Sequence, residues 1–162
     1  MSESLALPSS LYSPDQLGVV LMELQTHAEQ LRDAGVRKRL GRGADKSVAT
    51  GVEFSPLLAG VLEAAKADPN DAPQLEALAT NLEALRRQAP VVHLTFAAMP
   101  NAALKQKIAA WFREQIHPAF LLTFGARGDL GGGVVLQTGS HVYDYSFRQR
   151  ILDNKAKITQ GV

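Results

Sequence analysis

The chain of 162 residues contains no cysteine, which excludes a disulfide framework and any zinc site built on thiolates. Aromatic residues make up only 6% of it, with a single tryptophan. No stretch approaches the roughly 20 apolar residues that a transmembrane helix needs, so we expect no membrane span. The first ten residues include Glu3 and lack a basic start and an apolar core, which predicts no signal peptide. These features favour a protein of the reducing cytoplasm.

Charge is scarce overall but unevenly spread. The formal net charge is only +1, which argues against a general nucleic-acid binder. Residues 1–90 carry 9 Lys/Arg against 12 Asp/Glu, a balance of −3, whereas residues 91–162 carry 8 against 4, a balance of +4. This asymmetry predicts two units with different surroundings.

The first amphipathic segment has clear start and stop signals. Ser13 is followed three residues later by Gln16, a capping box that predicts a helix beginning here. Apolar residues then recur with a period of about 3.6, as in a helix with one buried face. Gly35 predicts the helix end, and the glycine- and charge-rich stretch 36–52 predicts a loop.

Two further helices are expected before the chain changes character. Ser55-Pro56 repeats the pattern of a capping residue followed by proline at the first helical position. Another helix opens near Pro73, and Ala89-Pro90 breaks it. We take this break as a domain boundary, which predicts a helical domain of residues 1–89.

A bundle of about three short helices cannot bury every apolar stripe, so we expect an exposed apolar groove among residues 13–89 that binds a partner helix. The candidate partner-binding residues are Leu17, Val20, Leu21 and Leu24 on the first helix and Leu75, Leu78, Leu82 and Leu85 on the third. The alternative is that these side chains pack on one another.

Residues 90–162 have the pattern of a small mixed domain. The expected elements are a strand at 91–96, a helix after Pro100-Asn101, strands at 120–124, 134–136 and 141–145, and a last helix capped by Ser146. The predicted fold class is therefore α+β, an N-terminal amphipathic helical bundle followed by a β-α-β-β-β-α domain. Gly131-Gly132-Gly133 predicts a turn with tight packing at the start of the third strand.

The residues that could carry chemistry do not form a recognisable site. No two of the four histidines, His27, His93, His117 and His141, stand at i,i+4 spacing, so we interpret them as surface or half-buried side chains and expect no metal or cofactor. Ser140, His141, Asp144 and Ser146 lie close in sequence, but adjacent strand residues point to opposite faces. We expect Ser146 to cap the last helix and Asp144 to bind turn amides, with no catalytic residue.

The most specific pattern begins at a glycine pair and ends in an arginine-rich segment. In order it contains Gly132, Gly133, an apolar strand, Gly139, a short strand, Asp144, Ser146, Arg148 and Arg150. It resembles the C-terminal signature of the delta subunit of F-type ATP synthases, the family of the mitochondrial oligomycin-sensitivity-conferring protein. The likeness covers residues 91–158.

The chain departs from this family at identifiable points. Tyr145 stands where the family has a glycine between Asp and Ser, and Gly131 replaces an apolar residue. The family's N-terminal domain is a six-helix bundle, whereas residues 1–89 contain three clear helices. The chain thus resembles a divergent member that is shortened at the N-terminus.

The resemblance implies a non-catalytic stator subunit of the peripheral stalk. In the family, the helical domain grips N-terminal segments of the alpha subunits, and the C-terminal domain holds the ends of the stalk b helices. The clamp stops the catalytic head from turning with the rotor, so that proton flow drives ATP synthesis. The implied location is cytoplasmic, peripheral on the inner face of the cell membrane through the complex, with no cofactor and no nucleic-acid partner.

An RNA-binding α/β module is the alternative hypothesis. The positive second half and the aromatic residues Tyr143, Tyr145 and Phe147 would favour it, since two tyrosines on one strand face could stack on single-stranded bases. A continuous patch of cations beside the tyrosines would support the RNA hypothesis, and scattered cations would support the stator hypothesis. The cations in question are Lys105, Lys107, Arg113, Arg148 and Arg150.

Overall fold

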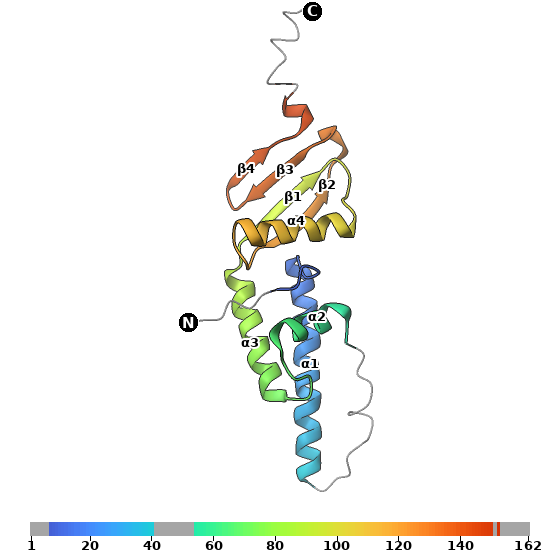
Figure 1. Ribbon diagram of the computed structural model, residues 1–162, viewed down its shortest axis with the longest axis vertical. Coiled ribbons are helices and arrows are strands. Elements are labelled where there is room, and N and C mark those ends of the chain that lie inside the picture. The colour runs from blue at the N-terminus through green and yellow to red at the C-terminus, as the bar shows by residue number, and fades with distance from the viewer. Residues whose placement is uncertain (1–6, 41–53, 151, 153–162) are drawn as a thin grey trace, which may run out of the picture. The chain divides into compact units, whose positions relative to one another are not determined.

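The chain divides between Ala89 and Pro90 into a helical unit and an α/β unit, as drawn in the computed structural model of Figure 1. The structure describes residues 7–40, 54–150 and 152. A long N-terminal helix leads into shorter helices and then into a four-stranded mixed sheet with a further helix. The predicted α+β fold class is confirmed.

The helices of the first unit begin at side-chain caps. They are α1 (Pro14–Arg39), α2 (Pro56–Ala65) and α3 (Ala72–Gln88). The hydroxyl of Ser13 accepts the Gln16 N–H at 3.1 Å, and Gln16 Oε1 accepts the Ser13 N–H at 3.1 Å, so the predicted capping box is confirmed. Ser55 Oγ and Asp71 Oδ1 cap α2 and α3 in the same way.

Gly35 does not end the first helix, so that prediction is wrong. The helix continues to Arg39, and the Leu40 N–H still donates to the Val36 carbonyl at 3.0 Å. Glycine in a helix costs only about 1 kcal/mol relative to alanine, and the arginines that follow are good helix formers. The predicted loop over 36–52 is therefore helical at its start, and residues 41–52 lie outside the described part of the chain.

The apolar stripes of α1 and α3 form the core of the helical unit. Of the eight candidate partner-binding residues, Leu17, Val20, Leu21, Leu24, Leu75, Leu78 and Leu82 are at most 5% exposed, and Leu85 is half-buried. An exposed apolar groove made by these residues is therefore ruled out, and they pack on one another. Leu7 and Leu11, which precede α1, are buried too, so the core receives more cover than three helices alone supply.

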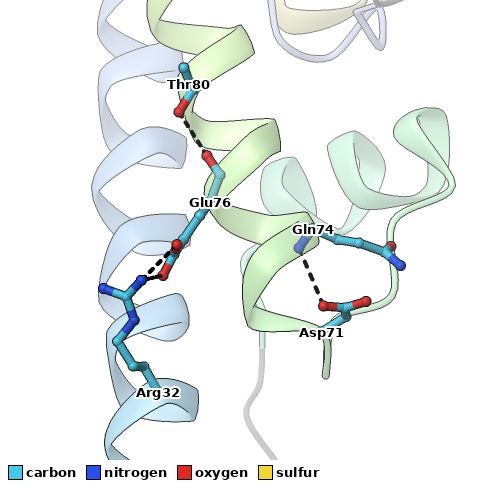
Figure 2. Close-up of polar contacts among 5 residues, drawn as sticks. All are labelled: Arg32, Asp71, Gln74, Glu76 and Thr80. Carbon is cyan, nitrogen blue, oxygen red and sulfur yellow. Dashed lines mark hydrogen bonds and ion pairs between the residues drawn. The ribbon is translucent and has the colours of Figure 1, made fainter.

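Polar contacts hold α1 and α3 antiparallel along their shared length. Arg32 Nη2 lies 2.7 Å and 2.8 Å from the two carboxylate oxygens of Glu76 (Figure 2), and nearer the other end Gln25 Nε2 donates to Glu83 Oε1 at 2.7 Å. Figure 2 also shows the Asp71 cap on the Gln74 N–H at the start of α3. These exposed pairs add little stability themselves, and burial of the leucines of both helices supplies most of it.

The α/β unit is a four-stranded sheet in the order β2-β1-β3-β4. Its elements are β1 (Val91–Phe96), α4 (Ala102–Gln115), β2 (Leu121–Ala126), the short helix η1 (Gly128–Leu130), β3 (Val134–Thr138) and β4 (His141–Asp144). Strand β1 pairs in parallel with β2, to which α4 provides the crossover, and antiparallel with β3, while β3 and β4 form a hairpin. The expected strand–helix–strand order with a terminal hairpin is confirmed.

Helix α4 covers one face of this sheet (Figure 1). Val92 and Leu94 on β1 point to that face and are buried, whereas His93 between them is exposed on the other. Ala109 and Phe112 of α4 are buried, and Phe112 contacts Phe120 ahead of β2 with ring centroids 5.5 Å apart. The alternation on β1 therefore places its buried apolar residues toward α4 and His93 on the other side of the sheet.

The position of Gly35 inside α1 can be tested by a pair of substitutions. An alanine β-carbon there would meet nothing within 4 Å, so Gly35→Ala should raise helix content and stabilise this end of α1 by up to about 1 kcal/mol. Gly35→Pro should instead lower the helical circular-dichroism signal, because proline removes a helical N–H. If neither change alters the signal, the helix ends before Gly35.

Candidate functional site

The glycines before β3 permit a close crossing of two backbone segments. Gly131, Gly132 and Gly133 all have positive φ, at 65°, 144° and 84°. A β-carbon on Gly133 would collide with the Tyr145 carbonyl oxygen and lie 2.9 Å from Ser146 Cα. One on Gly132 would lie 2.5 Å from the ring of Phe147. The predicted tight packing is confirmed, and it is contact with backbone that requires glycine at position 133.

The crossing segment is fastened by backbone hydrogen bonds. The Tyr145 N–H donates to the Val134 carbonyl at 2.9 Å, and the Phe147 N–H donates to the Gly132 carbonyl at 3.0 Å. The residues after β4 thereby extend the pairing past the strand. The start of the last helix, which is described at residues 147–150 and 152, is therefore held against the start of β3.

Ser146 and Asp144 complete this junction as predicted. The buried Ser146 hydroxyl accepts the Gln149 N–H at 3.2 Å, and Asp144 Oδ1 accepts the Ser146 N–H at 2.8 Å. Hydrogen bonds from the Ser146 hydroxyl and then from its backbone N–H lower the pKa of the Asp144 carboxyl, and the charges of Arg127 and Arg148 lower it further. Both side chains are thus committed to local structure.

Asp129 is a member of this cluster that the sequence interpretation missed. It lies on η1 and pairs with Arg127 Nε at 2.8 Å and with Arg148 Nη1 at 3.2 Å. The second contact ties the turn before the glycines to the last helix, across 19 residues of sequence. No local pattern marks such a pair, so it could be found only in the folded chain.

The remaining signature residues have distinct positions. Gly139, with φ of 53°, is the first residue of the two-residue turn between β3 and β4, where a hairpin of this type needs positive φ. Arg150 is exposed in the last helix. Tyr145, which stands where the resembled signature has a glycine, is 62% exposed, so this position accepts a large side chain without displacing the backbone beneath it.

Ser140 and His141 do not lie on opposite faces as predicted. Ser140 belongs to the turn, and its Oγ lies 3.4 Å from His141 Nδ1. Asp144, three residues further on, instead accepts a hydrogen bond from Ser146. The three side chains therefore form no Ser-His-Asp relay.

His27 is buried rather than on the surface, so this part of the histidine interpretation is wrong. Only 6% of it is exposed, its Nε2 donates to the Pro69 carbonyl at 2.8 Å, and its ring meets Phe54 edge-on. Nδ1 has no hydrogen-bond partner among the described residues. The histidine connects α1 to the turn before α3, and within the described ranges no group of three or more His, Asp or Glu side chains could hold a metal ion.

Several basic side chains of the α/β unit are held by internal contacts. Lys105 Nζ lies 5.6 Å from the centroid of the Phe124 ring, and Arg113 Nε donates to the Phe120 carbonyl at 3.3 Å. Burial lowers the pKa of the Arg113 guanidinium, which still stays protonated at neutral pH. These two cations contact β2 and the segment before it, and Arg148 pairs with Asp129 on η1, the short helix that follows β2.

Two exposed tyrosines lie at the β4 edge of the sheet, whereas the exposed Trp111 lies on α4. Tyr143 on β4 and Tyr145 just after it are both exposed. Lys107, on α4, is exposed as well, but it shares its helix with Lys105 and Arg113 and not with the tyrosines. Lys105, Arg113 and Arg148 are thus engaged by internal contacts, whereas Lys107 is exposed.

The fold defines an α+β protein with a helical unit and a mixed-sheet unit. No protein-family model matches the chain, and no curated protein sequence matches it. No helix in the described part of the chain is long and apolar enough to cross a bilayer.

Two alanine substitutions separate the effects of φ and of close packing at the glycines. Gly131→Ala should cost about 1–2 kcal/mol, since its β-carbon would meet nothing and only the positive φ is unfavourable. Gly133→Ala should cost about 1–3 kcal/mol more, because a backbone carbonyl occupies the space. Urea unfolding of both variants measures the difference, and equal losses would show that the crossing is not tightly packed.

The Asp144–Ser146 cap should be sensitive to acid. The pKa of Asp144 is lower in the folded chain, so its carboxylate stabilises the fold above the ordinary range of about 4 and loses this effect as pH falls through the folded value. At pH 7 Asp144→Asn should therefore be less stable than the parent, and the difference should shrink on acidification.

The serine of the cap gives a second measurement. Ser146→Ala should cost about 1 kcal/mol at pH 7, the usual value of an N-cap, whereas Ser140→Ala in the exposed turn should cost little. Carboxyl titration by NMR should also place Asp144 closer to its ordinary pKa in Ser146→Ala. An unchanged Asp144 titration would disprove the role assigned to the serine.

Proposed function

We propose that this chain is a non-catalytic peripheral-stalk subunit of an F-type ATP synthase, linking the catalytic head to the stalk b subunits so that proton flow drives ATP synthesis. The observation that carries the proposal is the junction between β3 and the last helix. Gly132, Gly133, Asp144, Ser146 and Arg148 are separated in sequence but meet in one structural cluster. Residues of the family-like signature thus stabilise one local structure together, as expected for a motif that maintains a fold.

The chemistry of the cluster supports a structural role over a catalytic one. Asp144 accepts a hydrogen bond from Ser146, and Asp129 forms ion pairs with two arginines. The space beside the glycines is filled by backbone atoms and by the ring of Phe147. A site that transfers protons or groups needs a titratable side chain that faces a substrate. The polar members of the cluster face each other instead.

The proposed partners are the N-terminal segments of the alpha subunits for the helical unit and the C-terminal helices of the b subunits for the α/β unit. Under this proposal the chain would work on the cytoplasmic side, peripheral to the inner face of the cell membrane. The apolar residues first considered for the alpha contact are buried, so that contact would have to use other side chains of the helical unit.

The alternative, an RNA-binding module, is favoured by Tyr143 and Tyr145, which are exposed at one edge of the sheet. A base-stacking platform also needs cations that follow the phosphate backbone beside the rings. Lys105 and Arg113 are instead engaged near β2, and Arg148 is paired with Asp129. Because these three cations are held by internal contacts, their placement supports the stator over the RNA hypothesis.

Affinity purification of the tagged chain from detergent-solubilised native membranes tests the assignment. Alpha and b subunits of the ATP synthase should copurify, and Gly133→Val should lose them, because it disrupts the junction. Gly131→Ala, which leaves the crossing free of a collision, should retain them. Absence of these subunits from the parent's complexes would contradict the proposal.

Titration with single-stranded RNA at low and raised salt tests the alternative. Phosphate contacts weaken steeply as salt rises. Micromolar, salt-sensitive RNA binding that Tyr143→Ala and Tyr145→Ala reduce, with no copurifying ATP synthase subunits, would replace the stator assignment with the RNA-binding one.

A further inference from the structure

Strand β4 lies at an edge of the four-stranded sheet (Figure 1), and each of its residues is exposed. The strand at the other edge, β2, is better covered, since its Leu121 and Leu122 are fully buried. An exposed edge strand offers unpaired backbone N–H and C=O groups to another strand. Natural edges are often protected by proline, lysine or a bulge, and none of these occurs in His141–Asp144.

The hydrogen bonds of the β3–β4 hairpin show which backbone groups point to the open edge. In an antiparallel pair, hydrogen-bonded and non-hydrogen-bonded residue pairs alternate along the strands. The Tyr145 N–H donates to the Val134 carbonyl, so the odd-numbered residues of 141–145 are the ones that bond to β3. The N–H and C=O groups of Val142 and Asp144 consequently point away from β3.

The side chains of the same segment form an aromatic row. His141, Tyr143 and Tyr145 occupy alternate positions and therefore share one face. The rings of His141 and Tyr143 are stacked, with centroids 6.4 Å apart, and Tyr143 and Tyr145 are 46% and 62% exposed. Aromatic side chains opposite each other on neighbouring strands stabilise a sheet. A strand with the same alternation of rings therefore complements this edge.

We infer that β4 pairs antiparallel with β4 of a second copy of the chain, with the two Tyr143 residues directly opposite each other. This register places Val142 of one copy opposite Asp144 of the other, so that their outward N–H and C=O groups bond to each other. It also places His141 opposite Tyr145, which covers the whole aromatic row. The edge is thus complementary to itself, as a two-fold symmetric contact requires.

The short length of β4 limits the strength of this contact. Two outward-pointing residues in each copy supply about four hydrogen bonds between the strands, so we expect a weak and reversible dimer. No like charges face each other, because Asp144 lies opposite Val142 and its carboxylate already accepts a hydrogen bond from Ser146. The inference uses no part of the proposed stator assignment, since it depends only on the edge of the sheet.

Single cysteines can report the register, because the chain has none of its own. Tyr143→Cys should form a disulfide-linked dimer under mild oxidation, since the Cα atoms of such an opposed pair lie about 4.5 Å apart, within the disulfide range. In the matched control Tyr145→Cys, the two cysteines are offset by about four residues, or roughly 13 Å. Tyr143→Cys should cross-link at least about 10-fold faster than this control. Random collision predicts the reverse, because Tyr145 is the more exposed residue.

Sedimentation velocity over a concentration series measures the same contact without a cross-link. The parent chain should shift from monomer towards dimer as its concentration rises. Val142→Pro removes an outward N–H at a position where an edge strand tolerates proline, and it should weaken self-association at least about 10-fold. Val142→Thr keeps the N–H and should self-associate like the parent. Circular dichroism should show the same fold for both variants.

Other results would overturn the inference. Equal cross-linking of the two cysteine variants, or a folded Val142→Pro variant that self-associates as strongly as the parent, would place any dimer contact elsewhere. A parent chain that stays monomeric at millimolar concentration would show that a second copy does not occupy the edge, and would leave it to an extended segment of another protein. Because these measurements use the purified chain alone, each outcome leaves the copurification test of the stator unaffected.

Discussion

The missing side chain of Gly133 makes room for the backbone of Tyr145 and Ser146, and the C-terminal half of the α/β unit depends on this crossing. Once the two segments touch, the Tyr145 and Phe147 amides reach the carbonyls of Val134 and Gly132. The same approach buries Ser146, whose hydroxyl then caps the last helix. It also brings Arg148 to Asp129. The absence of a side chain at a single glycine thus allows several polar contacts to form.

The helical unit follows a different constraint, the burial of apolar stripes by few helices. Helix α1 is long enough to pack against α3 and also to contact α2, and so its apolar stripe is buried by both. Leu7 and Leu11 add to the core before α1 begins. As a result, the surface between α1 and α3 is both apolar and charged, and it includes Met22 and Arg86 rather than a strip of leucines. Recognition at such a surface depends on electrostatics as well as on apolar contact.

The two units therefore differ in what their residues indicate about function. The signature residues of the α/β unit have mutual contacts that explain why they occur together, and this supports the proposed resemblance in architecture. Their contacts with one another identify no partner surface. In the helical unit the apolar stripes of α1 and α3 form the core, and no sequence motif marks a surface there. A sequence motif supports a function only for the part of the chain in which its residues lie.

Features encoded within one helical turn or one strand could be predicted from the sequence. The Ser13, Ser55 and Ser146 caps each involve a partner three residues away, and the strands around Val91 and Val134 have their own apolar pattern. Gly35 shows the limit of such signals, because a weak local preference against helix is outweighed by the residues around it.

What the tertiary structure alone decided are the contacts between residues distant in sequence. The burial of His27 depends on Pro69, which is 42 residues away, and the pairing of Asp129 with Arg148 spans 19. The sequence shows that α1 and α3 are amphipathic, but not whether their stripes meet each other or a partner. That outcome depends on how much apolar surface the whole unit can cover, a quantity that no single segment contains.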